Sequence, residues 1–416
     1  MKRYFLLLLL ILITAITYGQ NSFVVSGTVK DHQENLSGAS IYLNGFKIST
    51  STDKNGKFVL SNITPGSYEL LVQMIGYKPY SKKVIVADKS INVDITLSEK
   101  VTELSAVVIR PDPNRDYYLN LFKNFFIGDT PNSKECDILN LNVLSLYRDR
   151  DKGTLVASSN DFLIIENRAL GYRIKYMLDK FEYNFDKKVL FFAGYSTFEE
   201  MEGKSSDLKR WIKNRETAYN GSAIHFIKSL YQRTTREEGF VMYKRREIPN
   251  KDRYPDSLID VNLSQIMKGK MVTQLSSNHK EANSMSYWLK EKKKPRFLHH
   301  LERKDVLIDT LVSAFNENIK KINFQDELFI VYKNEKEMPD YEKTPFYQSR
   351  PVDLQGKQVS VLKMLRAPIY FYKNGMIHNP QSTLHSGFWA YEKMADSVPL
   401  DYVPISSSKS SSKKNR

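Results

Sequence analysis

Apolar and polar residues alternate in short runs through the first part of the chain. The clearest runs are residues 39–43, 68–72, 84–86 and 91–97. Asn-Gly or Pro-Gly pairs lie between runs at residues 44–45, 55–56 and 65–66. Such pairs adopt the tight turns that join antiparallel strands. Because alternation with period two is typical of half-buried strands, we predict a seven-stranded β-sandwich over residues 20–110.

The pattern changes beyond residue 110, where Pro111 and Pro113 predict a linker. Apolar residues at helical spacing predict helices over residues 117–126, 205–219 and 223–231. Alternation predicts an antiparallel meander over residues 138–196 and further strands at residues 306–312, 327–332, 358–364 and 368–372. We therefore expect an α+β fold: the sandwich, then a larger mixed antiparallel-sheet-plus-helix domain over residues 111–405, then a basic Ser/Lys tail at residues 406–416.

Serine residues at the helix starts predict specific caps, because a serine hydroxyl accepts hydrogen bonds from the first free backbone N–H groups. Ser205 or Ser206 is expected to cap the helix over residues 205–219, and Ser222 the helix that follows it. Ser257 is expected to cap a short helix in the polar, Lys-rich region further on. Residues 400–402 are expected to dock on the rest of the molecule.

A basic and then strongly apolar stretch opens the chain. Lys2 and Arg3 precede the unbroken apolar run of residues 5–13. This order is typical of a secretory signal peptide, and the run is shorter than the roughly 20 residues of a membrane-spanning helix. We expect residues 1–19 to be removed by cleavage after Gly19, with an uncleaved anchor as the alternative. The chain is then exported, and we expect it in the periplasm or associated with the outer membrane.

Charge and cysteine content exclude further classes of protein and of partner. The 416 residues include 62 Lys and Arg against 47 Asp and Glu, a formal net charge of +15, and one cysteine. A single cysteine excludes a disulfide scaffold and a Cys-rich metal site. Export argues against nucleic acid as the partner of the basic clusters at residues 245–246, 292–294 and 409–416. These clusters are expected either to attract acidic glycans or lipid phosphates, with peripheral membrane association, or to be solvated surface.

Five segments of the first domain carry a resemblance to a known family. They are GTVKD at 27–31, LSGASI at 36–41, TDKNGKF at 52–58, ITPGSY at 63–68 and VQMIGYK at 72–78. In this order they resemble the carboxypeptidase regulatory-like domain, a transthyretin-like sandwich. In Gram-negative envelopes that domain often precedes the plug of TonB-dependent outer-membrane receptors. The resemblance implies a fold and a compartment, and it implies no peptidase activity because the regulatory domain carries no catalytic residues.

Short blocks in the remainder are similar to uncharacterised envelope proteins that carry the same first domain. The blocks are ALGYRI at 169–174, KRW at 209–211, NGS at 220–222 and LDY at 400–402. No function follows from this similarity.

One motif suggests metal chemistry. His299 and Glu302 have the ligand spacing of zinc carboxypeptidases, with His378 or His385 as a later third ligand. The pattern is short, and basic residues on both sides of it repel a divalent ion. A zinc metallocarboxypeptidase is therefore the distant alternative, and we expect no bound metal.

Other reactive residues have structural explanations. Ser206 with Lys209 and Ser360 with Lys363 fit the serine–lysine nucleophile spacing, but the first serine is better explained as a helix cap. In a strand, a lysine three positions after a serine points to the opposite face. His225 is expected to face solvent and Cys136 to be buried. No phosphate-binding loop or dinucleotide fingerprint occurs in the sequence, so we expect no cofactor.

These observations favour a non-enzymatic accessory or interaction protein of the cell envelope, whose partner is an envelope protein or outer-membrane complex. The alternative is a glycan- or peptide-binding accessory of outer-membrane uptake. Aromatic residues make up 12% of the chain, and Trp288, Trp389 and Tyr391 are the candidate binding residues. This alternative requires that the tryptophans, Trp211 included, are exposed together.

Overall fold

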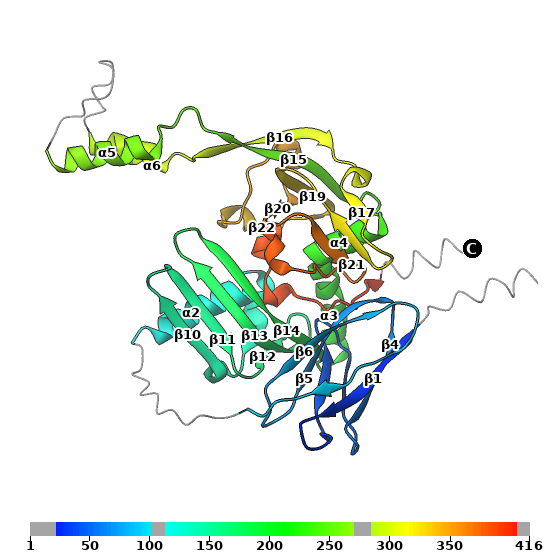
Figure 1. Cartoon of the computed structure of the whole chain (residues 1–416). Helices are drawn as coiled ribbons and strands as arrows, with labels where there is room; N and C mark the ends of the chain where they lie inside the picture. The colour runs from blue at the N-terminus through cyan, green and yellow to red at the C-terminus, as the bar shows by residue number, and fades with distance from the viewer. Residues whose placement is uncertain (1–21, 101–112, 270–283, 406–416) are drawn as a thin grey trace, which may run out of the picture.

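The computed structural model describes residues 22–100, 113–269 and 284–405 (Figure 1). The predicted leader over residues 1–19, the predicted linker and the basic tail at residues 406–416 lie outside the described residues. Among the helices of the described ranges, none combines the length and the apolar character that a membrane crossing requires.

The N-terminal part is a β-sandwich of two four-stranded sheets. One sheet contains β4 (Lys57–Ile63), β1 (Phe23–Lys30), β7 (Ile91–Asn92) and β8 (Ile95–Thr96). The other has the order β3 (Ser49–Ser51), β2 (Ser40–Leu43), β5 (Gly66–Gln73) and β6 (Tyr80–Val86). Alternate residues such as Val25, Ile41 and Val72 are buried in the core between them. The prediction of a sandwich is confirmed. It has eight strands instead of seven because the run at residues 91–97 forms two short strands, each parallel to β1.

A six-stranded antiparallel sheet follows the sandwich. Its strands are β9 (Cys136–Ile138), β10 (Leu144–Asp149), β11 (Thr154–Ser159), β12 (Leu163–Asn167), β13 (Tyr172–Asn184) and β14 (Val189–Glu200). The predicted antiparallel pairing is confirmed, but the order is not a simple meander, because β11 and β12 both pair with β13 at different points along its length. Helix α2 (Arg115–Ile127) packs on this sheet through Phe122 and Phe126, which contact the rings of Phe181 and Tyr176.

A second, five-stranded sheet has the order β16 (Phe297–Asp305), β15 (Phe240–Pro249), β19 (Glu327–Lys336), β20 (Lys357–Met364) and β22 (Thr383–Gly387). A three-stranded sheet of β17 (Val312–Ala314), β18 (Ile319–Ile322) and β21 (Ile369–Tyr372) accompanies it. The predicted strands at residues 327–332, 358–364 and 368–372 are confirmed. The predicted strand at residues 306–312 is wrong, because a 3-10 turn at Ile308–Thr310 precedes β17.

The remaining helices are α3 (Ser205–Tyr219), α4 (Ala223–Gln232), α5 (Asp256–Met267), α6 (Met285–Lys293) and α7 (Phe388–Tyr391). Ser222 caps α4 as predicted, since its hydroxyl accepts from the backbone N–H of His225 at 3.2 Å. The other cap predictions are wrong. The N-cap of α3 is Lys204, whose backbone N–H donates to Asp207 (3.2 Å), and the N-cap of α5 is Pro255.

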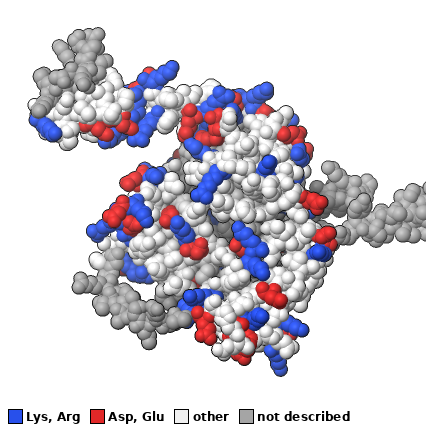
Figure 2. Space-filling model, viewed as in Figure 1, with Lys and Arg blue, Asp and Glu red and all other residues white. Residues whose placement is uncertain are grey.

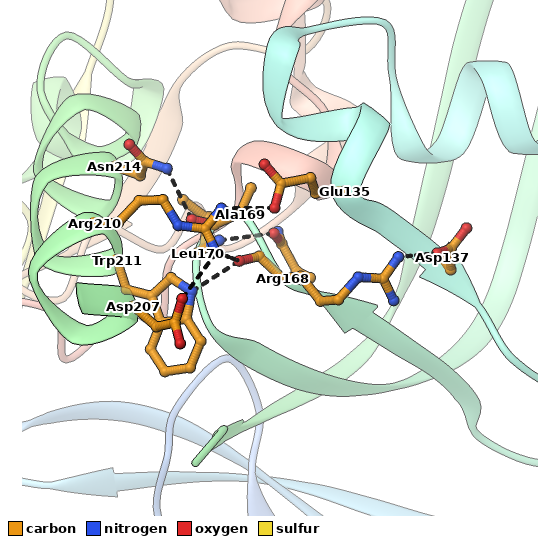
Figure 3. A network of polar contacts seen from close by, with 10 residues as sticks. Glu135, Asp137, Arg168, Ala169, Leu170, Asp207, Arg210, Trp211 and Asn214 are labelled. Carbon is orange, nitrogen blue, oxygen red and sulfur yellow. Dashed lines mark hydrogen bonds and ion pairs between the residues drawn. The ribbon is translucent and has the colours of Figure 1, made fainter. Parts of the chain in front are cut away.

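Side chains of α3 hold the turn between β12 and β13 (Figure 3). The indole Nε1 of Trp211 donates to the carbonyl of Arg168 at 2.8 Å, and Asn214 donates to the carbonyl of Ala169 at 2.9 Å. Gly171 has a φ of +68°, and a Cβ there would lie 2.1 Å from the Trp211 ring. The blocks at residues 169–174 and 209–211 are therefore two halves of one structural contact.

The sandwich packs directly on the residues that follow it, which we call the body (the described residues from 113 onward). The Gly45 N–H donates to the Ser196 carbonyl, and the Gly45 carbonyl accepts from the Leu400 N–H, both at 2.7 Å. Lys47 forms an ion pair with Glu200 at 2.9 Å. Residues 400–402 thus dock between sandwich and body, as expected.

Candidate functional site

A cavity of about 930 Å³ lies where the sandwich, helices α3 and α4, strand β19 and the C-terminal segment meet. Its lining includes Tyr68, Tyr219, Lys228, Tyr332, Asp401 and Tyr402. Pockets of roughly 300–1,000 Å³ that combine aromatic walls with a few converging polar groups are the usual form of small-ligand sites. This cavity is the candidate functional site.

Lys228 lies on the wall that α4 contributes. Its ammonium group donates to the carbonyl of Leu400 at 2.7 Å and to that of Tyr402 at 3.4 Å, the two residues that flank Asp401. The same Nζ lies 5.2 Å from the centre of the Tyr219 ring. Burial away from water lowers the pKa of Lys228 to about 8. The lysine therefore fixes the C-terminal segment at the edge of the cavity.

Two carboxylates on the cavity wall, Asp401 and Glu335, are partly buried. Burial raises the pKa of Asp401, and its Oδ1 has no hydrogen-bond partner among the described residues. Burial also raises the pKa of Glu335, which accepts from Asn220 at 3.1 Å and from Gln358 at 3.4 Å. A cluster of titratable groups with shifted pKa values in a cleft is typical of functional sites.

His225 is buried, so the prediction that it faces solvent is wrong. Its Nδ1 accepts from the Gly221 N–H at 3.1 Å, which leaves the proton on Nε2, and Nε2 lies 3.2 Å from Glu238. The ring stacks on Tyr219 and is covered by Phe240, the first residue of β15. Both ring nitrogens are engaged, so His225 positions Glu238 and lowers its pKa through the hydrogen bond.

The structure buries all the aromatic residues that were candidate ligand contacts. Trp288 is 0%, Trp389 7% and Tyr391 4% exposed, and Trp211 is 5% exposed. Trp389 donates to the carbonyl of Gly221 at 2.7 Å, and Trp288 fills the core between α5 and α6. These rings are core residues and cannot stack on a ligand together, which removes the tryptophan argument for a glycan- or peptide-binding accessory.

The residues of the predicted metal motif are not brought together. His299 and Glu302 lie on opposite faces of β16, and His378 contacts the Tyr372 hydroxyl elsewhere, at 2.6 Å. The other candidate third ligand, His385, packs its ring against Trp389.

Ligand atoms of His299 lie instead within 4.8 Å of those of Glu247 and Glu327. Both carboxylates are already paired with cations, Glu327 with Arg245 at 2.8 Å and Glu247 with Lys363 at 2.9 Å. Burial and the charge of Arg245 lower the pKa of His299. A divalent ion would have to displace two ion pairs, so this group fits an ion-pair network on the sheet surface.

The serine–lysine pairs also serve structural contacts. The hydroxyl of Ser360 accepts from the backbone N–H of Trp389 at 3.1 Å, and Lys363 points to the other face of β20, toward Glu247. Ser206 lies in the first turn of α3, which begins after Lys204. Cys136 is buried as predicted, and burial raises the pKa of its thiol to about 12, so it stays protonated.

The cavity groups were largely missed at the level of sequence. Lys228 lies on a helix that was predicted, and Glu335 lies in an ordinary strand, so neither had a local signal. The LDY block at residues 400–402 did mark the segment that contributes Asp401. In chemical terms, the cavity offers tyrosines, amides, carboxylates and two lysines, Lys228 and Lys373, a set suited to recognition by hydrogen bonding.

Comparison with solved structures finds only partial likenesses. A mutant type II cohesin–X-dockerin complex from Acetivibrio cellulolyticus is 17% identical over 18% of this chain and 58% of that chain, with a TM-score of 0.18. A 3-chlorocatechol 1,2-dioxygenase from Rhodococcus opacus is 12% identical over 20% of this chain and 62% of that chain, with a TM-score of 0.17. A DUF3823 family protein from Parabacteroides merdae is 12% identical over 46% of this chain and 87% of that chain, with a TM-score of 0.17. The chain thus covers less than two thirds of the first two structures, and likenesses at these scores carry no functional argument.

A search of curated proteins finds no match. The model of one protein family, the CarboxypepD_reg-like domain, matches residues 25–109. This range runs from the third residue of β1 through β8, and it contains all five segments that suggested the resemblance. Residues 25–109 are a CarboxypepD_reg-like domain.

Proposed function

We propose that the chain is an accessory protein of the bacterial cell envelope that binds a polar ligand in the cavity between sandwich and body. The signal-peptide pattern at residues 1–19 supports export. The CarboxypepD_reg-like domain supports an envelope location, because its sequence segments resemble the domain that precedes outer-membrane receptor plugs. The sandwich acts here as one wall of a binding site, since Phe46 and Tyr68 line the cavity.

The observation that carries the proposal is that charged groups are partly buried in the cavity wall, at a cost in folding free energy. Burying an ammonium group and carboxylates without full pairing destabilises a protein, and such groups are usually paired or replaced by apolar residues. Here Lys228, Glu335 and Asp401 converge on one space of ligand size. A ligand that adds hydrogen bonds to these groups accounts for their retention.

With the tryptophans buried, it is the tyrosines, amides and carboxylates of the cavity lining that favour a short glycan. Tyrosine rings cover the apolar face of a small polar molecule while amides and carboxylates take its hydroxyl hydrogens. Tyr402 offers a partly exposed ring, and the buried Tyr68, Tyr219 and Tyr332 form the wall behind it. Burial raises the pKa of Tyr332 and of Tyr402 to about 12. A short peptide is the second candidate, because the Lys228 ammonium and the Asp401 carboxylate lie on the same wall and match the two peptide termini. The zinc peptidase alternative gains no support, because His299, Glu302 and His378 lie apart.

The test is calorimetric titration of the purified chain with a panel of neutral di- and trisaccharides and a panel of tri- and tetrapeptides. Gln232 is exposed at the end of α4 and lines the cavity, so Gln232→Trp is designed to fill it. Gln355→Trp is the matched control on an exposed turn outside the cavity. We expect one panel to bind wild type and Gln355→Trp but not Gln232→Trp. Absence of binding by both panels, or binding that Gln232→Trp leaves unchanged, would contradict the proposal.

A further inference from the structure

The β15–β16 ribbon forms an arm that leaves the body. Strand β15 pairs with β19 only over residues 240–245, whereas its pairing with β16 continues to Pro249 and Phe297. Beyond that point the arm ends in α5 and α6, which pack on each other around Ile259, Leu263 and Trp288. Figure 1 shows this helical tip projecting away from the rest of the molecule. The tip therefore has its own small core.

Exposed apolar side chains are concentrated on this arm. It carries seven of the 22 large hydrophobic residues that are exposed among the described residues, although it is a small part of the chain. They are Ile248, Val261, Met267, Met285, Leu289, Phe297 and Leu298. Met285 and Leu289 are four residues apart on α6 and are 38% and 45% exposed, whereas the neighbouring Trp288 is buried. Apolar groups that cluster in this way on a surface mark an interaction site.

Basic residues surround these apolar groups. Between residues 248 and 298 the described residues include eight Lys and Arg against four Asp and Glu, a net charge of 8 − 4 = +4. Lys293 lies one helical turn after Leu289, in line with Met285 and Leu289. Lys290 directly follows Leu289, and both lysines are exposed. Figure 2 shows Lys and Arg side chains along the projecting arm. Met285, Leu289 and Lys293 thus share one face of α6, and Lys290 lies at its edge.

We infer that the tip of the arm is a contact site for an anionic lipid surface. Helices that carry apolar residues flanked by lysines lie in the interface of a bilayer, where apolar side chains enter the acyl boundary and lysines meet lipid phosphates. A protein partner fits less well, because lysine is depleted at protein–protein interfaces. The face formed by Met285, Leu289, Lys290 and Lys293 has the composition that the lipid interface selects. The inference does not depend on the ligand cavity.

The test is co-sedimentation of the full chain with vesicles of phosphatidylcholine containing roughly 30% phosphatidylglycerol, compared with vesicles of phosphatidylcholine alone. We expect binding to the anionic vesicles only, weakened when salt rises from about 0.05 M to about 0.5 M. Lys290→Gln with Lys293→Gln should lower the partition coefficient about 25-fold, since each lysine near the surface contributes about fivefold. Leu289→Asn should lower it about fivefold or more.

Matched controls separate the tip from general surface effects. Lys54→Gln with Lys89→Gln removes two exposed lysines from the sandwich, and Leu365→Asn changes an exposed leucine of the body. These variants should bind like wild type, and circular dichroism should show all variants folded. Equal binding to both vesicle types, or equal losses in tip and control variants, would overturn the inference. So would a dimer in sedimentation velocity that only the tip variants dissociate, since the arm would then contact protein.

Discussion

Gly45→Ala tests whether the C-terminal segment fastens the sandwich to the body. Gly45 has a φ of +84°, and an added Cβ would lie 2.6 Å from Cδ1 and 3.0 Å from Cγ of Leu400. The backbone of Gly45 also donates to Ser196 and accepts from Leu400. The substitution therefore perturbs a residue that bonds both to β14 and to the C-terminal segment.

The magnitude has two parts. An alanine in the left-handed region costs about 1–2 kcal/mol wherever it occurs. The second part is local: Leu400 packs against the sandwich core and must move, which removes about 1–2 kcal/mol of apolar burial. Gly38→Ala is the matched control, because Gly38 has a φ of +81° with no atom within 4 Å of the added Cβ. The difference between the two variants isolates the Leu400 contact.

Amide hydrogen exchange measures this difference at the affected segment. The Leu400 N–H is protected by its bond to the Gly45 carbonyl, so its exchange reports local opening. We expect exchange at Leu400 to be about tenfold faster in Gly45→Ala than in Gly38→Ala, since about 1.4 kcal/mol corresponds to a factor of ten. Equal exchange in the two variants would refute the proposed role of this contact.

Three further predictions concern single side chains. Burial lowers the pKa of Lys228 to about 8 from the ordinary 10.5. Between about pH 8 and pH 10.5 the unfolded chain therefore binds more protons than the folded chain, so the free energy of unfolding rises with pH across that window. Urea unfolding at about pH 7.5 and about pH 9.5 should show a smaller rise for Lys228→Met than for wild type; an equal rise would contradict the burial of this lysine. Trp211→Phe removes the hydrogen bond to the Arg168 carbonyl and should lower the free energy of unfolding by about 1 kcal/mol, whereas an unchanged value would mean that the indole N–H is dispensable. The thiol of Cys136 should react with a thiol reagent far more slowly in the native protein than in urea, and similar rates would show that it is accessible.

Periodicity in the sequence predicted the elements that bury one face. Helix α3 was predicted at its observed bounds, and the sandwich strands were recognised because their inner residues alternate with exposed ones. Strands β15 and β16 were not predicted. The inner half of β15 is buried almost continuously and the outer halves of both strands are exposed on both faces, so neither strand shows the alternation that the prediction requires. Their pairing is made by backbone hydrogen bonds, which leave no pattern in the side chains.

The candidate site depended on tertiary packing that a local pattern does not contain. His225 lies off the apolar face of α4 taken alone, but Phe240 of β15 and Tyr332 of β19 cover it from outside the helix. Lys228 and Asp401 are far apart in the sequence and meet only because the C-terminal segment folds back on α4. The glycan- or peptide-binding alternative required exposed tryptophans, yet each packs in a core, and Trp211 and Trp389 donate their indole N–H groups to backbone carbonyls.

Native mass spectrometry of the protein recovered from the envelope fraction of cells that make it tests the central claim most directly. We predict the mass of a chain that lacks residues 1–19, together with a small bound molecule that is absent from the Gln232→Trp variant. A full-length chain found in the cytosol, or the same adduct on wild type and Gln232→Trp, would contradict the claim that an exported protein binds its ligand in the cavity between sandwich and body.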